Sequence, residues 1–399
     1  MKPSYNFLCI SCEYKGIEFL ESCHAEGHRV WLVTAAGLED EPWPRHALED
    51  IFFLPEIKHG EWPMPDLIAG TAWLLRQHRI DRVIALDDFD VEEAAELREY
   101  FRIPGMGQTT ARYFRDKLAM RMKAAEAGLR IPAFSALFHD ADIAAFAKNH
   151  PAPWVVKPRS DASAKGIRKV HSEKELWLVL DELGEERHRY LVEQFKPGDV
   201  YHVDALSQDG KVVFATASKY LSPPFDVAHA GGIFRSALLP PNTPESKALK
   251  AFNQDVLRAF GMQFSASHTE FIRCHEDGEF YFLETSARVG GAHLADMIEA
   301  ATGLNMWREW ARLESAVVRG EKYQLPPLRD QYAGIIVSLA RQEHPDTSEF
   351  DDPEVVWRLD KPWHIGLIVA SPDRKRVLEL LDDYARRIAA RWAAHAEEG

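Results

Sequence analysis

The chain has 399 residues, of which 46% are hydrophobic and 28% charged, and its formal net charge is −14. This length supports a large core in two or three domains, and the ordinary apolar fraction excludes a disordered or fibrous protein. The acidic balance and the lack of a long Lys/Arg block argue against an extended nucleic-acid surface, so we expect small-molecule partners and no nucleic acid.

Cysteine usage and hydropathy bear on the compartment. The chain has four cysteines, Cys9, Cys12, Cys23 and Cys274, too few and too irregularly spaced for a disulfide framework. Cys9 and Cys12 have CxxC spacing, but no second pair completes a zinc site, so buried thiols are expected. No apolar run approaches the roughly 18 residues of a membrane span, and no signal peptide precedes the first strand. The sequence predicts a cytoplasmic protein without a membrane partner.

The first hundred residues alternate between strand and helix patterns. Strands are expected at 6–11, 30–34, 51–54 and 82–86, and helices at 17–26 and 67–78. This alternation predicts an open parallel sheet, and because it carries no GxGxxG fingerprint a dinucleotide site is not expected. Asp87, Asp88 and Asp90 follow the last strand, where such sheets bind ligands. We prefer the simpler interpretation that they cap helices in a solvated loop.

Further along the chain, a β-hairpin brings two carboxylates together. Residues 268–272 and 280–288 are rich in β-branched and aromatic side chains and flank an Asp277-Gly278 turn signal. A three-residue loop centred on Asp277 places Glu270 opposite Glu284, with Cβ atoms roughly 5 Å apart, whereas a two-residue turn shifts the register by one.

Facing carboxylates repel each other unless a proton or a cation lies between them. Because strand side chains alternate, Ser286 and Arg288 share the face of Glu284, which favours a divalent metal near a phosphate-binding cation. The alternative is an exposed hairpin whose acidic residues only keep it soluble.

Beyond the hairpin, Gln324-Leu325-Pro326-Pro327 marks a boundary, and strands at 332–339 and 364–369 precede a helix over 374–392.

The hairpin resembles the metal-binding and catalytic segment of ATP-grasp enzymes, whose usual form is Glu, then Glu-x-Asn-x-Arg followed by Gly-Gly. Here Glu270 is followed by Glu284-Thr285-Ser286-Ala287-Arg288 and Gly290-Gly291. Other segments fall in that family's order: Arg115-Asp116-Lys117, Gly128 to Pro132, Trp154 to Pro158, and Tyr190 to Phe195 with Gly198. Their order over about half of the chain is more specific than any single match.

The resemblance implies a fold of mixed α/β and α+β class. An N-terminal open parallel-sheet domain, of the kind that precedes ATP-grasp folds, would span 1–107. A two-lobed ATP-grasp domain would span 108–325, with lobes over 108–189 and 190–325. A small C-terminal α/β subdomain would span 326–399.

The implied cofactors are ATP and Mg²⁺, with Mn²⁺ as an alternative metal. Lys117 and Lys157 would bind phosphates, and Lys157 also interrupts a buried run, which needs an anion to offset its desolvation. The loop 159–166 takes the place of the family's glycine-rich phosphate loop, although Gly166 is its only glycine. The nucleotide-binding residues implied are Lys117, Lys157, Ser163, Gly166, Glu193, Gln194, Phe195 and Asp199. Among these, Glu193, Gln194 and Phe195 would present backbone groups to adenine, and Asp199 or Glu193 would bind ribose.

The resemblance also implies a reaction centre. Glu270, Glu284 and Ser286 would bind metal, and Arg288 would be the catalytic residue that stabilises the transferred phosphoryl group. Substrate contacts are expected from Arg235, His268, Gly290, Gly291 and His293. Arg235 follows Gly231-Gly232 in an expected mobile loop, with a surface arginine as the alternative, and Gly290 to His293 would open a helix whose amides hold an anion.

The implied function is an ATP-dependent carboxylate–amine ligase that forms an acylphosphate and releases ADP and phosphate. Segments such as Ser267 to Glu270 resemble the amino-acid and dipeptide ligase branch, so amino acids are the expected substrates, and a homodimer is the expected assembly. One alternative is a carboxylase of the same superfamily acting through carboxyphosphate, although no biotin-attachment segment is present. The other is a nucleotide-binding protein that has lost catalysis, which the glycine-poor loop and Ser286 favour and the retained Arg288, Glu270 and Glu284 oppose.

Overall fold

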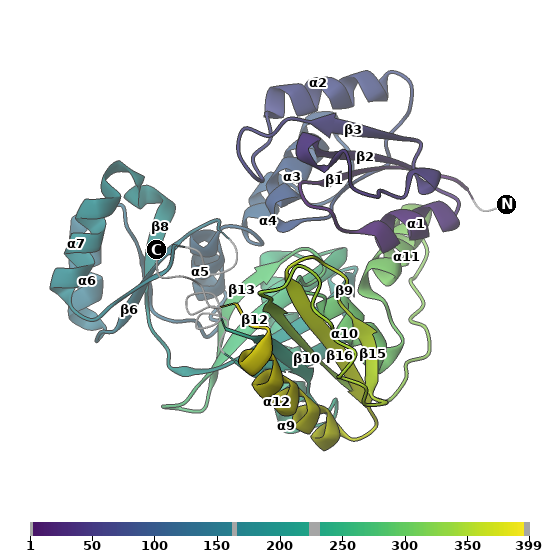
Figure 1. Ribbon diagram of the computed structural model, residues 1–399. Coiled ribbons are helices and arrows are strands. Elements are labelled where there is room, and N and C mark those ends of the chain that lie inside the picture. The colour runs from purple at the N-terminus through teal and green to yellow at the C-terminus, as the bar shows by residue number, and fades with distance from the viewer. Residues whose placement is uncertain (1–2, 162–165, 223–231, 395–399) are drawn as a thin grey trace.

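The computed structural model describes residues 3–161, 166–222 and 232–394 of the chain, which form three sheets (Figure 1). The N-terminal sheet has the strand order β3-β2-β1-β4, and every pair is parallel. Its elements are β1 (Asn6–Ser11), α1 (Ile17–Ala25), β2 (Arg29–Ala35), β3 (Asp50–Leu54), α2 (Met64–Leu75), β4 (Arg82–Ala85) and α3 (Val91–Phe101). The central strands β2 and β1 are almost wholly buried, as a parallel sheet covered on both faces requires. The predicted parallel sheet is confirmed.

A small antiparallel sheet of order β5-β8-β6-β7 forms a separate lobe, on the left of Figure 1. Its elements are α5 (Lys117–Glu126), β5 (Phe134–Ala136), α6 (Asp140–Asn149), β6 (Trp154–Pro158), β7 (Arg168–Val170), α7 (Glu173–Leu183) and β8 (Tyr190–Gln194), and α4 (Gln108–Arg112) leads into it. Apolar residues of α6 and α7 pack on the face that carries Val156 and Val192. The strand neighbours Lys157 and Glu193 therefore point to the other face, toward α5.

The third sheet has eight antiparallel strands in the order β13-β12-β9-β10-β11-β14-β16-β15. Its strands are β9 (Gly198–Gln208), β10 (Lys211–Tyr220), β11 (Phe234–Leu238), β12 (Ser265–Cys274), β13 (Phe280–Ser286), β14 (Tyr332–Leu339), β15 (Val355–Arg358) and β16 (His364–Ser371). Four helices cover it: α9 (Pro244–Phe260), α10 (Leu294–Thr302), α11 (Met306–Arg319) and α12 (Arg374–Arg391). Core contacts place α10 and α11 on one face, and α9 and α12 on the other.

The last three strands extend this sheet rather than forming one of their own. β14 pairs with β11, and β16 and β15 continue outward from it. The predicted strands at 332–339 and 364–369 and the final helix are present as β14, β16 and α12. The division of the chain at residue 325 stays a prediction, because the C-terminal elements share their sheet with the preceding lobe.

Candidate functional site

The two carboxylates of the hairpin face each other as predicted, but a β-bulge brings them there. Near the turn, Arg273 pairs with Phe280, one residue away from the register that a three-residue loop predicts. The register then shifts between Phe271 and Glu270, so that Glu270 lies directly opposite Glu284. A bulge adds one residue to one strand and re-aims the side chains beyond it. The predicted pairing is confirmed, and the predicted turn register is wrong.

The face around these carboxylates is rich in polar groups. His202 pairs with Glu270 across β9 and β12, and Ser286 pairs with His268 across β13 and β12, so all four share the face. Among the described residues, neither Glu270 Oε2 nor Glu284 Oε1 has a hydrogen-bond or ion-pair partner. Two opposed carboxylates with free oxygens suit Mg²⁺ or Mn²⁺, which prefer oxygen ligands. The residues present therefore fit the implied metal.

Lys117 links the predicted nucleotide site to Glu284. Its Nζ lies 3.0 Å from Glu284 Oε2 and donates to the carbonyl of Asp161 at 2.8 Å. Asp116 caps α5 through the amide of Leu118, which fixes the lysine at the first turn of the helix. Burial alone would raise the pKa of Glu284, but the charges of Lys117 and Lys157 outweigh it and lower that pKa to about 2. Glu284 is therefore an anion held by a neighbouring cation.

Lys157 belongs to a buried charge cluster with Glu193 and Arg121. Lys157 Nζ lies 2.8 Å from Glu193 Oε2, and Arg121 Nε lies 2.7 Å from Glu193 Oε1. Burial lowers the pKa of Lys157 to about 8, even though Glu193 opposes that shift. The anion that offsets this buried lysine is thus Glu193, whereas the sequence suggested phosphate. Arg121 was missed, although its place four residues after Lys117 puts both on one helix face.

The other predicted nucleotide residues differ in position. The amides of Gln194 and Phe195 donate to the carbonyls of Ala133 and Pro153, so neither N–H is free for a ligand. Gly166 has a φ of 69° beside Pro158, and Ser163 lies outside the described residues.

Asp199 and Arg235 do not join the carboxylate face. Asp199 pairs with Lys219 at 2.8 Å, and strand alternation puts both on the face of Tyr201, opposite that of His202. Arg235 neighbours Ser236, whose hydroxyl contacts His202, so Arg235 also lies on the opposite face. There Arg235 Nη1 pairs with Asp382 of α12 at 2.6 Å. These positions do not support the predicted nucleotide and substrate roles. Gly231 of the expected loop before Arg235 lies outside the described residues.

Glu270 is connected to a chain of hydrogen-bonded polar side chains that was not predicted from the sequence. Asp204 accepts from His202 Nδ1 at 2.7 Å and from His268 Nδ1 at 2.8 Å. Tyr220 donates to Glu270 Oε1 at 2.7 Å, and His268 Nε2 lies 3.5 Å from the same oxygen. Burial would lower the pKa of His268, but Asp204 and Glu270 raise it to about 9. Only the i, i+2 spacing of His202 and Asp204 on a strand hinted at a shared face.

The two glycines after Arg288 are not equivalent. A Cβ on Gly290 would lie 2.7 Å from Asp204 Oδ1 and 2.9 Å from His268 Nδ1, so this position must lack a side chain. A Cβ on Gly291 would meet nothing within 4 Å. His293 caps α10 in the left-handed region, with Nδ1 3.1 Å from Asp296 and its ring 4.7 Å from that of Trp357.

Arg288 acts through its charge on Asp87, which follows the last strand of the N-terminal sheet. Arg288 Nε is buried and has no hydrogen-bond partner among the described residues. The charges of Lys15 and Arg288 overcome burial and lower the pKa of Asp87 to about 2. Asp87 caps the short turn that follows β4, as predicted. The predicted solvated loop is wrong, because Asp87, Asp88 and Asp90 are all buried and engaged by neighbouring residues. The cysteines are buried free thiols, as expected.

None of the helices that the structure describes is both long and apolar enough to span a membrane.

The chain is similar to known proteins in sequence and in fold. Residues 150–296 match the model of the ATP-grasp domain family. An L-arginine-specific L-amino acid ligase of Bacillus subtilis is 27% identical over 262 residues, which cover 64% of this chain but only 62% of that ligase. The crystal structure of an L-amino acid ligase from Bacillus licheniformis matches over the full length of both chains with a TM-score of 0.73 and 20% identity. N5-carboxyaminoimidazole synthetase from Staphylococcus aureus, complexed with ADP, matches with a TM-score of 0.71 and 15% identity over 96% of this chain and 98% of that chain.

Proposed function

This chain carries an ATP-grasp domain and resembles the L-amino acid ligases, and from that premise we propose that it is an ATP-dependent ligase that joins a carboxylate to an amine. The observation that carries the proposal is the pairing of Glu270 with Glu284 across β12 and β13, with Lys117 at 3.0 Å. Two carboxylates and a lysine close together could hold a divalent metal and the phosphates bound to it. The sequence similarity to an L-amino acid ligase favours amino acids as substrates.

In this proposal the metal-binding residues are Glu270 and Glu284, with Ser286 offering a shorter, weaker oxygen ligand beside them. Bound Mg²⁺ or Mn²⁺ neutralises phosphate charge during transfer. Tyr220 and His268 hold one oxygen of Glu270 and leave the other for the metal. Of the two metal-binding carboxylates, Glu270 is thus held by Tyr220 and His268, and Glu284 is held by Lys117.

Nucleotide binding would use the lysines of the small lobe. Lys117 contacts Glu284, and the charge of Lys157 lowers the pKa of Glu284, so both lysines would act on phosphates bound beside the metal. Between β8 and β9, the amides of Gln194 and Phe195 already donate to backbone carbonyls. The amide of Lys196 has no acceptor among the described residues. Adenine would therefore bind to the Lys196 amide and the neighbouring carbonyls. The solved relative with ADP supports a nucleotide in this fold.

The reaction would proceed through an acylphosphate. The substrate carboxylate attacks the γ-phosphorus, ADP leaves, and the amine then displaces phosphate from the acyl carbon. Arg288, with a buried Nε free of protein acceptors in the described structure, would stabilise the negative charge of both steps. His268, His293 and the backbone at Gly290 would line the substrate side.

The test is a screen of ADP release over pairs of L-amino acids, with mass spectrometry of the products. We expect ADP and phosphate, formed only when both substrates are present, together with a dipeptide. An Arg288→Met variant that still binds ATP should lose product formation. Release of AMP and pyrophosphate would contradict the acylphosphate route.

The carboxylase alternative has a specific observation behind it, because the fold also matches N5-carboxyaminoimidazole synthetase. It predicts ADP release that depends on bicarbonate and needs no amino acid. The same screen with and without bicarbonate, in carbon dioxide-free buffer, separates the two functions.

A further inference from the structure

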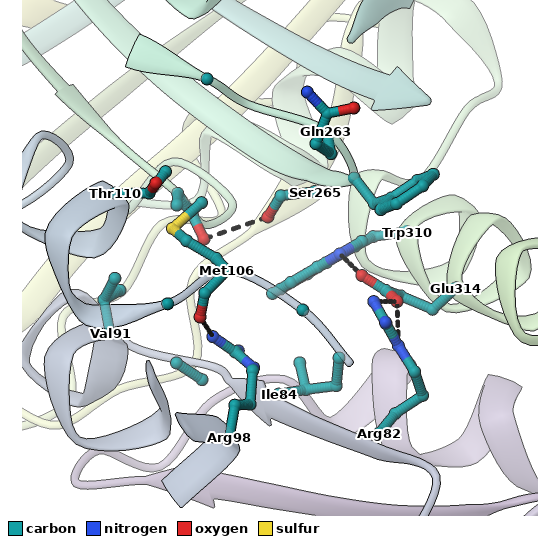
Figure 2. A pocket seen from close by; sticks show the side chains of 16 residues that line it. Arg82, Ile84, Val91, Arg98, Met106, Thr110, Gln263, Ser265, Trp310 and Glu314 are labelled. Atoms are coloured by element: carbon teal, nitrogen blue, oxygen red, sulfur yellow. Dashed lines mark hydrogen bonds and ion pairs between the residues drawn. The ribbon is translucent and has the colours of Figure 1, made fainter. Parts of the chain in front are cut away.

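A cavity of about 220 Å³ lies between the N-terminal sheet and the beginning of β12 (Figure 2). Ile84 and Arg98 line it from the first domain, and Ser265, Trp310 and Glu314 line it from the large lobe. Ser265 is on the face of β12 opposite that of Glu270, because the two residues are an odd number apart on one strand. The cavity is therefore separate from the facing carboxylates.

Arg98 forms the cationic wall of the cavity. Its Nε donates to the carbonyl of Val83 and its Nη1 to the carbonyl of Met106, both at 2.9 Å. Within the described ranges its other N–H groups have no protein acceptor. Burial and the nearby charge of Arg82 lower the pKa of Arg98 to about 10, so this guanidinium is poorly compensated where it stands.

The opposite wall is already neutralised. Figure 2 shows Arg82, Glu314 and Trp310 together, across the cavity from Arg98. Arg82 Nε donates to Glu314 Oε2 at 2.9 Å, and Trp310 Nε1 donates to Glu314 Oε1 at 3.2 Å. Both oxygens of Glu314 are engaged by Arg82 and Trp310, and the charge of Glu314 offsets that of Arg98 only in part. The lining residues thus contain two guanidinium groups and one carboxylate.

Size and lining limit what the cavity can hold. Its volume is below the roughly 300–1,000 Å³ of sites for drug-sized ligands, so the ligand must be compact. Ile84, Val91 and Trp310 give it an apolar body, whereas Arg98 gives it a charged hydrogen-bond donor. An ammonium group would find no free carboxylate on these walls, which excludes an amino-acid zwitterion.

We propose that this cavity is a second small-molecule site, which binds a compact monocarboxylate with an apolar body and no ammonium group. The carboxylate pairs with Arg98, and the body packs on Trp310 and Val91. Ser265 donates to the carbonyl of Ala287 at the cavity wall, at 3.2 Å, and Ala287 directly precedes Arg288. The ligand would therefore lie beside the residue that directly precedes the proposed catalytic arginine.

The test is isothermal titration calorimetry of butyrate into the full chain without nucleotide or metal. We expect saturable binding of one butyrate per chain, and binding of butyramide weaker by about tenfold or more, because the amide lacks the charge. Arg98→Met should weaken butyrate binding to the same extent. Val91→Phe, which fills the cavity and leaves Arg98 in place, should do likewise.

Two variants serve as controls. Arg258→Met removes an exposed arginine of α9 and should leave butyrate binding unchanged. Lys157→Met alters the proposed nucleotide site and should also leave it unchanged. Arg98→Met removes two hydrogen bonds to the backbone, so thermal melting checks that this variant folds. If Arg98→Met does not fold, butyrate binding by Val91→Phe tests the proposal instead. Absent butyrate binding, equal affinity for butyramide, full binding by folded Val91→Phe, or weakening by Lys157→Met each overturns the proposal.

Discussion

Lys157 shows how a single residue can be predicted for one reason and found for another. A lysine inside a buried run must have an anion, and the sequence suggested phosphate. The structure supplies Glu193 at 2.8 Å, held also by Arg121. The identity of that partner could not be predicted, because Glu193 lies on another strand and Arg121 on a helix. The lysine nevertheless remains next to the phosphate side of the site, through its effect on Glu284.

Lys157→Met should weaken ATP binding by about 1.5–3 kcal/mol, the value of one charged hydrogen bond to phosphate. Methionine keeps the volume, and Arg121 still neutralises Glu193. Calorimetry of ATP binding measures the change, with exposed Lys148→Met as the matched control. Equal ATP affinity in both variants would remove Lys157 from the site.

The affinity for ATP should also fall as pH rises above about 8. The pKa of Lys157 is lowered from 10.5 to about 8 in the folded protein, so its ammonium form is lost through that pH. Phosphate binds the ammonium form, and each further pH unit should therefore cost up to about tenfold in affinity until the bound-state pKa is reached. A titration of ATP affinity against pH in wild type and Lys157→Met checks this, since the variant should lack the decline.

At the scale of elements, the strands of the hairpin and the opposition of its carboxylates were predictable, but the bulge was not. Alternation and the Asp-Gly turn set the strands, whereas no residue pattern marks a bulge. Alternation also fixes faces only within one strand. The sequence does not reveal which residues of β9 and β11 share the face of Glu270. Asp199 and Arg235, expected in the nucleotide and substrate sites, lie on the opposite face, and His202 and Asp204 were missed.

Gly290→Ala should destabilise the protein by about 1–3 kcal/mol, because the new methyl group would overlap Asp204 and His268. Gly291→Ala is the matched control and should change the free energy of unfolding much less, since nothing lies within 4 Å. Urea denaturation of both variants measures the difference. Similar stabilities would mean that the Asp204–His268 pair yields easily.

At the scale of the whole molecule, the N-terminal parallel sheet and the two lobes after it were predicted in outline, but the extent of the large sheet was not. Two of the three strands after residue 325, β14 and β16, were predicted, whereas β15 was missed. β14 pairs with β11, although five other elements lie between them along the chain. Such long-range pairing leaves no local signal, so a proline-marked boundary suggested a subdomain where the structure has a continuous sheet.

A chain ending at residue 325 should therefore fail to form a stable monomer. Loss of residues 326–399 would expose the edge of β11 and the apolar residues that α12 and β16 cover, including Ala237 and Leu238. Size-exclusion chromatography and circular dichroism of the shortened chain measure this. A folded monomer with ATP affinity equal to that of the full chain would show that the last 74 residues, 326–399, are an independent unit.

The contact between Lys117 and Glu284 has a consequence for the order in which ligands arrive. In the free protein, Lys117 pairs with the Glu284 carboxylate that would bind the metal. Mg²⁺ alone must therefore compete with the lysine for this carboxylate. Nucleotide phosphates offer Lys117 a substitute partner and release the carboxylate. Metal should therefore bind weakly by itself and tightly with nucleotide, which calorimetric titrations with and without ADP can compare. Lys117→Met should remove that gating and strengthen binding of the metal alone, and weaker binding by the variant would show that Lys117 does not obstruct it.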